Sequence, residues 1–202
     1  NILLNAVMIN EAKDSSEIEN IITTHDELYK ALSQSSGASL EAKEVVNYRS
    51  AIWEGYQLVL EKGILTVNMI VSIQGIVEGN QAGIRKLPGT VLLNSKTNEV
   101  VYTPPSDERE IRNLLSNLEE YINEVDDRVD PLIKLSVIHF QFESIHPFYD
   151  GNGRTGRIIN IIYLVLRDLL NSPILYLSRY INKNKSEYYR LLQEVRTQQN
   201  WE

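Results

Sequence analysis

A cluster of residues suited to phosphate chemistry lies at positions 146–157, which read HPFYDGNGRTGR. Gly151 and Gly153 allow the backbone to turn its N–H groups inward, and the N-terminus of a following helix adds a positive dipole, so the segment can cradle an anion. Arg154 and Arg157 project to neighbouring positions on the first helical turn, where they can hold phosphate oxygens. These residue types in this order predict a phosphate-binding loop.

Two further side chains of this segment have catalytic potential. Asp150 offers the hard oxygen ligand that Mg²⁺ takes from proteins when substrate phosphates supply other ligands. His146 is the side chain of the segment best suited to accepting a proton near neutral pH. Each residue alone is common in structural roles, but the combination within one short segment predicts a functional site.

The composition is that of an ordinary globular domain and restricts the function. The 202 residues include 20 Lys and Arg against 27 Asp and Glu, a formal net charge of -7, so we expect no nucleic-acid partner. The absence of cysteine excludes disulfides, thiolate catalysis and cysteine-based metal sites, and it fits the cytoplasm, where we expect the protein. The longest apolar run, 158–166, is too short to span a bilayer, so we expect no membrane partner.

The organisation of the chain predicts a single domain over residues 1–202, because its length suits one core and no internal boundary is visible. The first residue is Asn1 rather than Met, and the chain stops abruptly at Glu202. We therefore expect a fragment of a longer protein.

The predicted fold class is mainly α, a helical bundle with one inserted β-hairpin, because most of the chain shows the helical period. Ser106 is expected to cap the helix after the hairpin, and Asn184 and Glu187 have the spacing of a capping box. The predicted elements are helices over about 14–34, 40–60 and 66–77, strands over 90–93 and 99–103, a helix from 106, and helices over 131–145, 155–170, 174–181 and 186–198.

The segment 146–157 is similar to the signature of the Fic (filamentation induced by cAMP) family, HxFx(D/E)GNGRxxR, at every specified position. The hairpin at 88–103 lies where that family carries its substrate-binding flap, and the resemblance covers roughly residues 12–200. It implies a Fic-type bundle and a protein adenylyltransferase, which moves AMP from ATP to a Ser, Thr or Tyr hydroxyl of a target protein. The target segment is expected to dock on the flap as an added strand.

The resemblance also implies a role for individual residues. His146 would take the proton of the attacking hydroxyl, and Asp150 would hold Mg²⁺ on the α- and β-phosphates of ATP. Phe148 would face the core and anchor the loop. Tyr188 and Tyr189 resemble aromatic residues that line the adenine pocket of relatives, although a packed aromatic pair explains them nearly as well. The residues expected to hold the phosphates are Gly151, Asn152, Gly153, Arg154 and Arg157.

A shorter motif, SSEIEN at 15–20, resembles the inhibitory motif (S/T)xxxE(G/N) of Fic proteins with an N-terminal inhibitory helix. Ser15 and Glu19 fill its fixed positions. In that class the glutamate pairs with the second arginine of the signature, here Arg157, and keeps the γ-phosphate from a productive pose. Ser16 and Glu19 also have the spacing of a helix capping box, but the neighbouring signature favours the charge pair.

Several alternatives are compatible with these residues. A deAMPylase, or a bifunctional enzyme, would use Glu19 to align water and remove AMP from a target. A phosphotransferase-type Fic enzyme would bind its donor in another orientation, and a non-catalytic regulatory module would bind nucleotide without turnover. The sequence names neither the target nor the oligomeric state, and a homodimer is one of the states open to it.

The other two histidines are expected to be structural. His139 lies two turns before His146 on a mostly apolar helix, which is typical of a hydrogen-bonded core histidine. His25 lies on the first predicted helix, beside its apolar stripe. The chain has no two-histidine spacing of the kind that binds zinc.

Overall fold

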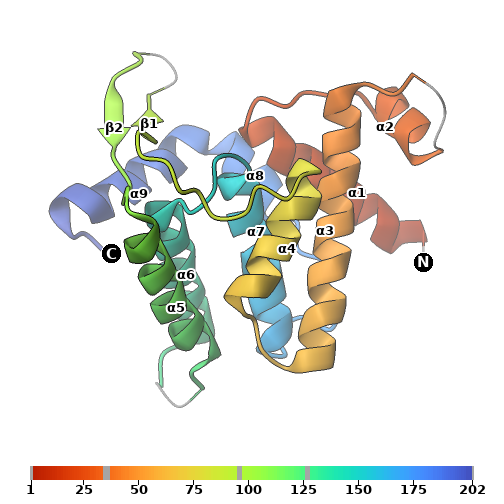
Figure 1. Ribbon diagram of the computed structural model, residues 1–202. Helices are drawn as coiled ribbons and strands as arrows, with labels where there is room; N and C mark the ends of the chain where they lie inside the picture. Colours follow the sequence, from red (N-terminus) through yellow and green to blue (C-terminus); the bar gives the residue numbers. More distant parts are fainter. Residues whose placement is uncertain (1, 34–36, 95–96, 126–127, 202) are drawn as a thin grey trace.

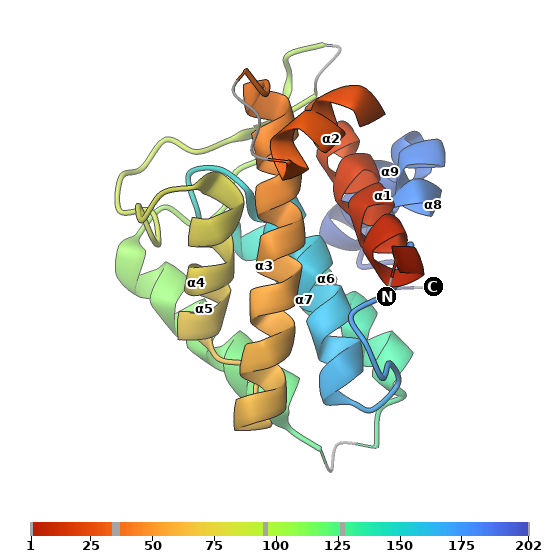
Figure 2. The same ribbon diagram turned by 90° about the vertical axis from the view of Figure 1, so that its right-hand side faces the viewer.

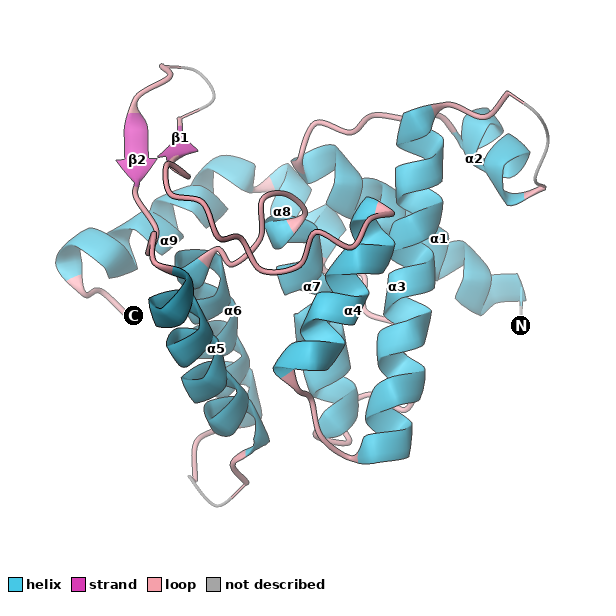
Figure 3. Ribbon diagram, in the orientation of Figure 1, coloured by secondary structure: helices cyan, strands magenta, loops and turns pink. Residues whose placement is uncertain are grey.

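The computed structural model describes residues 2–33, 37–94, 97–125 and 128–201. This part of the chain forms a helical bundle from which one short hairpin projects (Figures 1 and 3). The fold is therefore mainly α, as predicted. The elements are α1 (Ile2–Ile18), α2 (His25–Leu32), α3 (Leu40–Lys62), α4 (Val67–Glu78), β1 (Leu92–Leu93), β2 (Val100–Tyr102), α5 (Glu108–Asn123), α6 (Pro131–Ile145), α7 (Asn152–Leu166), α8 (Ser178–Lys183) and α9 (Lys185–Gln198).

Helix α7 is the centre of the bundle. It packs against α3, α4 and α6 and touches α1, and Figure 2 shows it behind α3. Every residue from 154 to 165 is buried, because the sequence of this helix is apolar nearly all round. It begins at Asn152 and ends at Leu166, so the predicted span of 155–170 is displaced. The segment after α6 is therefore fixed to the most buried element of the fold.

The helices that surround α7 have the ends that their local residues dictate. The Ser39 hydroxyl accepts from the N–H of Ala42 at the start of α3, and Gly63 ends that helix in the left-handed conformation. At the start of α6, the Asp130 side chain accepts from the N–H of Leu132, and Pro131 lies in the first turn. The predicted spans for α3, α4 and α6 are each within two residues of the observed ones.

The prediction of one N-terminal helix over about 14–34 is wrong. Helix α1 ends at Ile18, and the chain turns through Glu19 and Asn20, which has a positive φ of 64°. Thr24 then caps a separate helix, α2, by accepting from the N–H of Glu27. His25 is exposed at the first position of α2 and so does not lie beside a buried stripe. The segment SSEIEN at 15–20 therefore lies at the end of a helix.

Two predicted caps are also wrong. Asp107, not Ser106, caps α5, because its carboxylate accepts from the N–H of Glu110. Asn184 makes no side-chain cap bond to α9, and Glu187 instead pairs with Arg190 on the exposed face of that helix. The last two helices are α8 (Ser178–Lys183) and α9 (Lys185–Gln198), rather than 174–181 and 186–198.

The hairpin is shorter than predicted. Its strands pair antiparallel, with Leu92 opposite Tyr102 and Leu93 opposite Val100. The Tyr102 hydroxyl donates to the carbonyl of Ser144 at 3.1 Å, which ties the hairpin to α6. The strand regions are 92–93 and 100–102, and the tip at 95–96 lies outside the described residues.

None of the helices in the described part of the chain combines the length and apolar character needed to cross a membrane.

Candidate active site

The segment that we call the phosphate loop, residues 146–157, joins the C-terminus of α6 to the first turns of α7. His146 ends α6 in the left-handed conformation, with φ 48°. Gly151 stands before α7 with φ 76°, and glycine offers no side chain to cap the helix from that position. The first N–H groups of α7 are thus left open to a ligand, as an anion-binding helix terminus requires.

An internal brace holds the loop in shape. The side-chain carbonyl of Asn152 accepts from the N–H of Phe148, and its amide donates to the Phe148 carbonyl, both at 2.9 Å. Phe148 is fully buried and packs on Phe142 of α6. The Asn152 side chain, expected to orient phosphate, is therefore already engaged within the loop.

The loop lines a cavity of about 110 Å³. Glu19, in the turn after α1, lies in the cavity wall, although 138 residues separate it from Arg157. A Cβ atom on Gly153 would collide with the Glu19 carboxylate, so glycine is what allows this anion to lie against the loop. The lining residues are Glu19, His146, Tyr149, Asp150, Gly151, Asn152, Gly153 and Arg154.

Arg157 and Glu19 form an ion pair, the Glu19–Arg157 pair. Nη2 of Arg157 donates to Oε1 of Glu19 at 2.8 Å. Nε of Arg157 donates to the Ser15 hydroxyl at 2.7 Å, and Nη2 also donates to the Ser15 carbonyl at 2.9 Å. Ser16 and Glu19 do not form a capping box. A capping box needs its serine at the start of a helix, whereas Ser16 lies inside α1 near its C-terminal end and Glu19 follows that end.

Burial works against the charge on Arg157, whose side chain is 2% exposed. Burial is the largest single influence on its pKa, but Glu19, Tyr48 and Tyr188 together outweigh it and raise the pKa of the guanidinium. Arg157 is therefore held as a buried cation by one carboxylate and one serine. Removal of the carboxylate would leave that cation available to another anion.

Buried contacts also fix the helix that carries this motif. The carboxylate of Glu11, 2% exposed, accepts from the hydroxyl and the N–H of Ser178. The hydroxyl of Tyr176 donates to Asp14, and Lys185 donates to the carbonyl of Ile18 at the end of α1. Helix α1 is thus attached at several points, whereas Glu19 lies in the turn after it.

Arg154 makes contacts that the sequence did not predict. Its Nη1 donates to Glu44 of α3 at 2.8 Å, and its Nη2 donates to Glu78 of α4 at 2.7 Å. Burial raises the pKa of Glu78 although Arg154 opposes the rise. Both sides of the guanidinium fork are therefore occupied by carboxylates, and Arg154 links α7 to two neighbouring helices. Nothing in the local sequence marks either glutamate, because 110 and 76 residues separate them from Arg154.

The surroundings of His146 favour its neutral form. Burial, and then the positive charge of Arg85, lower its pKa from 6.5 to about 4, while the Glu143 backbone and the Glu19 carboxylate act in the opposite direction. A neutral imidazole can accept a proton at physiological pH. The residue therefore has the protonation state that a general base needs.

Asp150 places a carboxylate where it could hold a magnesium ion that arrives with phosphates. Its Oδ1 accepts from the N–H of Gly151 at 2.7 Å, and its backbone carbonyl accepts from Gln74 of α4 at 3.1 Å. The described residues contain no cluster of three metal-ligating side chains. One carboxylate on the cavity wall fits Mg²⁺, which keeps waters and shares substrate phosphates.

Tyr188 and Tyr189 do not belong to the cavity lining. The Tyr188 hydroxyl lies 2.6 Å from Nε2 of His139, and its ring packs on Tyr189. His139 also lies 3.1 Å from the Asn160 amide, and burial lowers its pKa to about 4. His139 is thus the hydrogen-bonded core histidine that was predicted.

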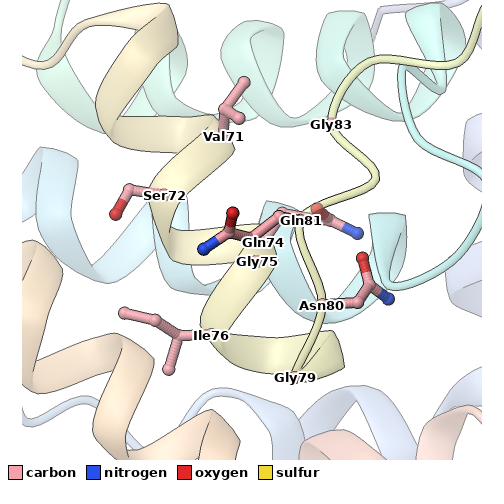
Figure 4. A pocket seen from close by; sticks show the side chains of 9 residues that line it. All are labelled: Val71, Ser72, Gln74, Gly75, Ile76, Gly79, Asn80, Gln81 and Gly83. Carbon is pink, nitrogen blue, oxygen red and sulfur yellow. The ribbon is translucent and has the colours of Figure 1, made fainter.

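A larger hollow, of about 470 Å³, has Gln74 of α4 in its lining (Figure 4). The end of α4 and the chain that follows it form the walls. Its lining carries amides and a hydroxyl but no acidic, basic or histidine side chain, so it has no group for acid–base chemistry. The lining residues are Val71, Ser72, Gln74, Gly75, Ile76, Gly79, Asn80, Gln81 and Gly83.

Comparison with solved structures defines the class of fold. A Fic family protein from Desulfovibrio desulfuricans matches with a TM-score of 0.80 at 21% identity, covering 100% of this chain and 60% of that one. A Fic domain containing signaling protein from Bacteroides thetaiotaomicron matches with a TM-score of 0.76, also at 21% identity, over 94% of this chain and 72% of that one. The fold is the Fic fold.

The family follows from the sequence comparison. The model of the Fic/DOC family matches residues 15–164, and the chain belongs to this family, as its loop motif predicted. A probable protein adenylyltransferase of Aquifex aeolicus is 30% identical over 171 residues. The match covers 83% of this chain and 51% of that protein, so the chain spans about half the length of this curated relative.

Proposed function

We propose that the protein transfers AMP from ATP to a hydroxyl group of a target protein. The observation that carries the proposal is the neutral His146 beside the open N-terminus of α7, in one cavity with Asp150. A relative whose name is that of a probable protein adenylyltransferase supports the same reaction. ATP and a target protein are then the substrates.

The chain's own residues suit this chemistry. The target oxygen would attack the α-phosphorus, the new P–O bond would replace the bond to the β-phosphate, and pyrophosphate would leave. His146 would accept the hydroxyl proton, and the N–H groups after Gly151 would stabilise the negative charge on the phosphate. Asp150 would hold Mg²⁺, which would offset the charge that develops on the leaving pyrophosphate. Positioning and charge stabilisation do most of the work in such a reaction.

The Glu19–Arg157 pair supports a second part of the proposal, that the protein restrains itself. The Glu19 carboxylate already lies against Gly153 and holds Arg157, so an incoming phosphate would meet a like charge and an occupied cation. Productive binding would require Glu19 to leave. Loss of Glu19 should therefore raise activity by about 5- to 150-fold, the range of a typical coupling free energy.

The test compares α-labelled and γ-labelled ATP, with Mg²⁺, in the wild-type protein and in Glu19→Gly. Label from the α position should enter the protein itself, more strongly in Glu19→Gly, and γ label should not. Glu17→Gly is the matched control, because Glu17 is two residues away and pairs only weakly with Lys13 at 3.6 Å. Label from the γ position would point to phosphotransfer, and ATP binding without any label would point to a nucleotide-binding module.

Removal of AMP is a second candidate, because the Glu19 carboxylate shares the cavity with His146. A carboxylate placed there could orient a water molecule for attack on an AMP-modified residue. A pre-AMPylated protein substrate incubated with the wild-type chain and Mg²⁺ should then lose its label, and Glu19→Gly should not remove it. Persistent label with the wild-type chain would count against this direction.

The flap is the proposed docking place of the target. Leu93 and Val100 are 51% and 59% exposed, and in the described part of the hairpin β1 pairs with β2 alone. An extended target segment could add to the edge of such a hairpin and bring its hydroxyl towards the cavity. Replacement of Val100 by proline should weaken target modification more than self-modification.

A further inference from the structure

Arg85 is a fully buried arginine in the segment between α4 and β1, and the phosphate-loop motif does not include it. Its exposed fraction is 0%. Its Nε donates to the carbonyl of His146 at 2.8 Å, and its Nη2 donates to the carbonyl of Ile145 at 3.3 Å and to that of Pro105. Its backbone N–H donates to Pro147 at 2.9 Å. One residue thus binds three successive carbonyls around His146.

These carbonyls belong to a turn that needs support. His146 has φ 48° and ψ 59°, a left-handed conformation that is unfavourable for a residue other than glycine. It also ends α6, where carbonyls lack helical partners and a positive charge is favourable. The Arg85 guanidinium supplies both the donors and the charge. Without it, the turn that directs the imidazole into the cavity would lose its main fixed partner.

Arg85 also connects this turn to the flap. It lies shortly before the flap, and the N–H groups of Lys86 and Leu87 donate to the Tyr149 hydroxyl at 2.9 and 3.2 Å. Pro105, which accepts from Arg85, comes directly after the flap. A movement of the hairpin at either end therefore acts on a side chain that is bonded to His146.

We propose that Arg85 is a positioning residue that holds the left-handed turn at His146 and links it to both ends of the flap. The inference rests on the proposed role of His146 as the base. Target docking on the flap would then be coupled to the placement of the base through one guanidinium group.

The charge of Arg85 also acts on the pKa of His146, and a role in packing alone would not change that pKa. Arg85 lowers the pKa of His146, second only to burial. Loss of this charge should therefore move that pKa upward, although burial keeps it below 6.5. The other groups that face His146 are Glu19 from the end of α1, Arg196 from α9, the backbone of Glu143 on α6, and the loop residues Tyr149, Asp150 and Arg154.

The first measurement is kinetic and uses the Glu19→Gly background. Arg85→Lys keeps the charge but cannot bond the separate carbonyls together, so kcat should fall by about 10- to 100-fold while KM for ATP stays unchanged. Arg167→Lys is the matched control. Arg167 also donates to carbonyls, those of Ile122 and Glu124, at a distance from the cavity. An unchanged kcat in Arg85→Lys, or an equal loss in both variants, would overturn the proposal.

The second measurement follows the three histidines by NMR titration without ATP. In Arg85→Met the pKa of His146 should rise from about 4 towards 6.5, and in Arg85→Lys it should stay low. Signals of His25 and His139 are internal references. An unchanged His146 titration in Arg85→Met would contradict the link, and failure of Arg85→Lys to fold would assign Arg85 to core stability alone. If the titrations come out as expected but no variant transfers AMP, the proposed function is rejected and the Arg85–His146 link is kept.

Discussion

In the phosphate loop, Phe148, Asn152 and Arg157 are 0, 3 and 2% exposed, whereas in the flap Leu93 and Val100 are 51 and 59% exposed. The loop is bonded to α1, α4 and the segment before the flap through Ser15, Gln74 and Arg85. In the flap, Tyr102 bonds to α6 and the Val101 carbonyl accepts from Gln193 of α9. The region proposed for chemistry is fixed from several sides, and the region proposed for recognition is left adaptable.

This difference follows from what each region has to do. Catalytic groups must keep their geometry within a fraction of an ångström, and buried, multiply bonded side chains achieve that. A strand edge that accepts an extended segment needs only exposed backbone and a few apolar contacts. Substitutions in the loop should therefore strongly change the free energy of unfolding or the rate of AMP transfer. Substitutions in the flap should change both quantities little.

The largest effect is expected for His146→Ala in the Glu19→Gly background. Loss of the general base should lower incorporation of α-labelled AMP by about 10²- to 10⁴-fold. The thermal unfolding of the variant serves as a control for its fold. A residual rate within about tenfold of the parent would contradict the role of base, because a positioned base contributes at least 10²-fold.

Next comes the internal brace of the loop. Asn152→Ala leaves the buried N–H and carbonyl of Phe148 without partners, so the free energy of unfolding should fall by about 2–4 kcal/mol. Urea unfolding measures the loss. A change below about 0.5 kcal/mol, typical of surface substitutions, would mean that the brace is not needed for the shape of the loop.

Glu143, on α6 behind the loop, should give a pH-dependent effect. Burial raises its pKa from 4.5 to about 7, and the charges of Arg157, Glu19 and Arg196 modify this value. The folded state therefore binds the proton more tightly than the unfolded chain, so this group costs stability as the pH rises from 4.5 to about 7.

Glu143→Gln removes that cost. Relative to wild type, the variant should gain on the order of 2–3 kcal/mol between pH 4.5 and pH 8. Urea unfolding at both pH values measures the gain. Glu99→Gln in the flap, which removes an exposed carboxylate, is the control. An equal stability difference at both pH values would show that Glu143 does not titrate differently in the folded chain.

The smallest effect is expected in the flap. Val100→Ser changes a mostly exposed side chain, so the free energy of unfolding should stay within about 0.5 kcal/mol of wild type. The rate of self-modification should also be unchanged, because this residue is outside the cavity lining. A loss comparable with that of Asn152→Ala would erase the contrast between the two regions.

Local signals account for what the sequence predicted well. Helix ends such as Pro131 and Gly63 depend on residues within one turn, and the phosphate loop depends on glycines and a helix start that are adjacent in the chain. The family follows from the same short motif. These features need no knowledge of tertiary contacts.

The missed contacts of the site join distant residues, whereas the two wrong caps, at α5 and α9, were choices between neighbouring residues. The end of α1 at Ile18 brings Glu19 to Arg157, and a helical pattern that continues past this point gives no sign of the break. The carboxylate partners of Arg154, and the carbonyl partners of Arg85, are equally remote in sequence. Periodicity reports which face of an element is buried, but it does not report which buried polar groups meet.

The attachment of α1 through Glu11 and Asp14 has an evolutionary consequence. Because these contacts precede Glu19, an exchange at Glu19 leaves the helix in place. Glutamate and glycine codons differ by a single nucleotide, so under the proposed self-restraint an unrestrained enzyme lies one point mutation away. Exchanges at Phe148, Asn152 or Arg157 would instead disturb buried side chains that are bonded or packed within the fold. Regulation would therefore be the most readily mutated property of this protein, and its reaction one of the least.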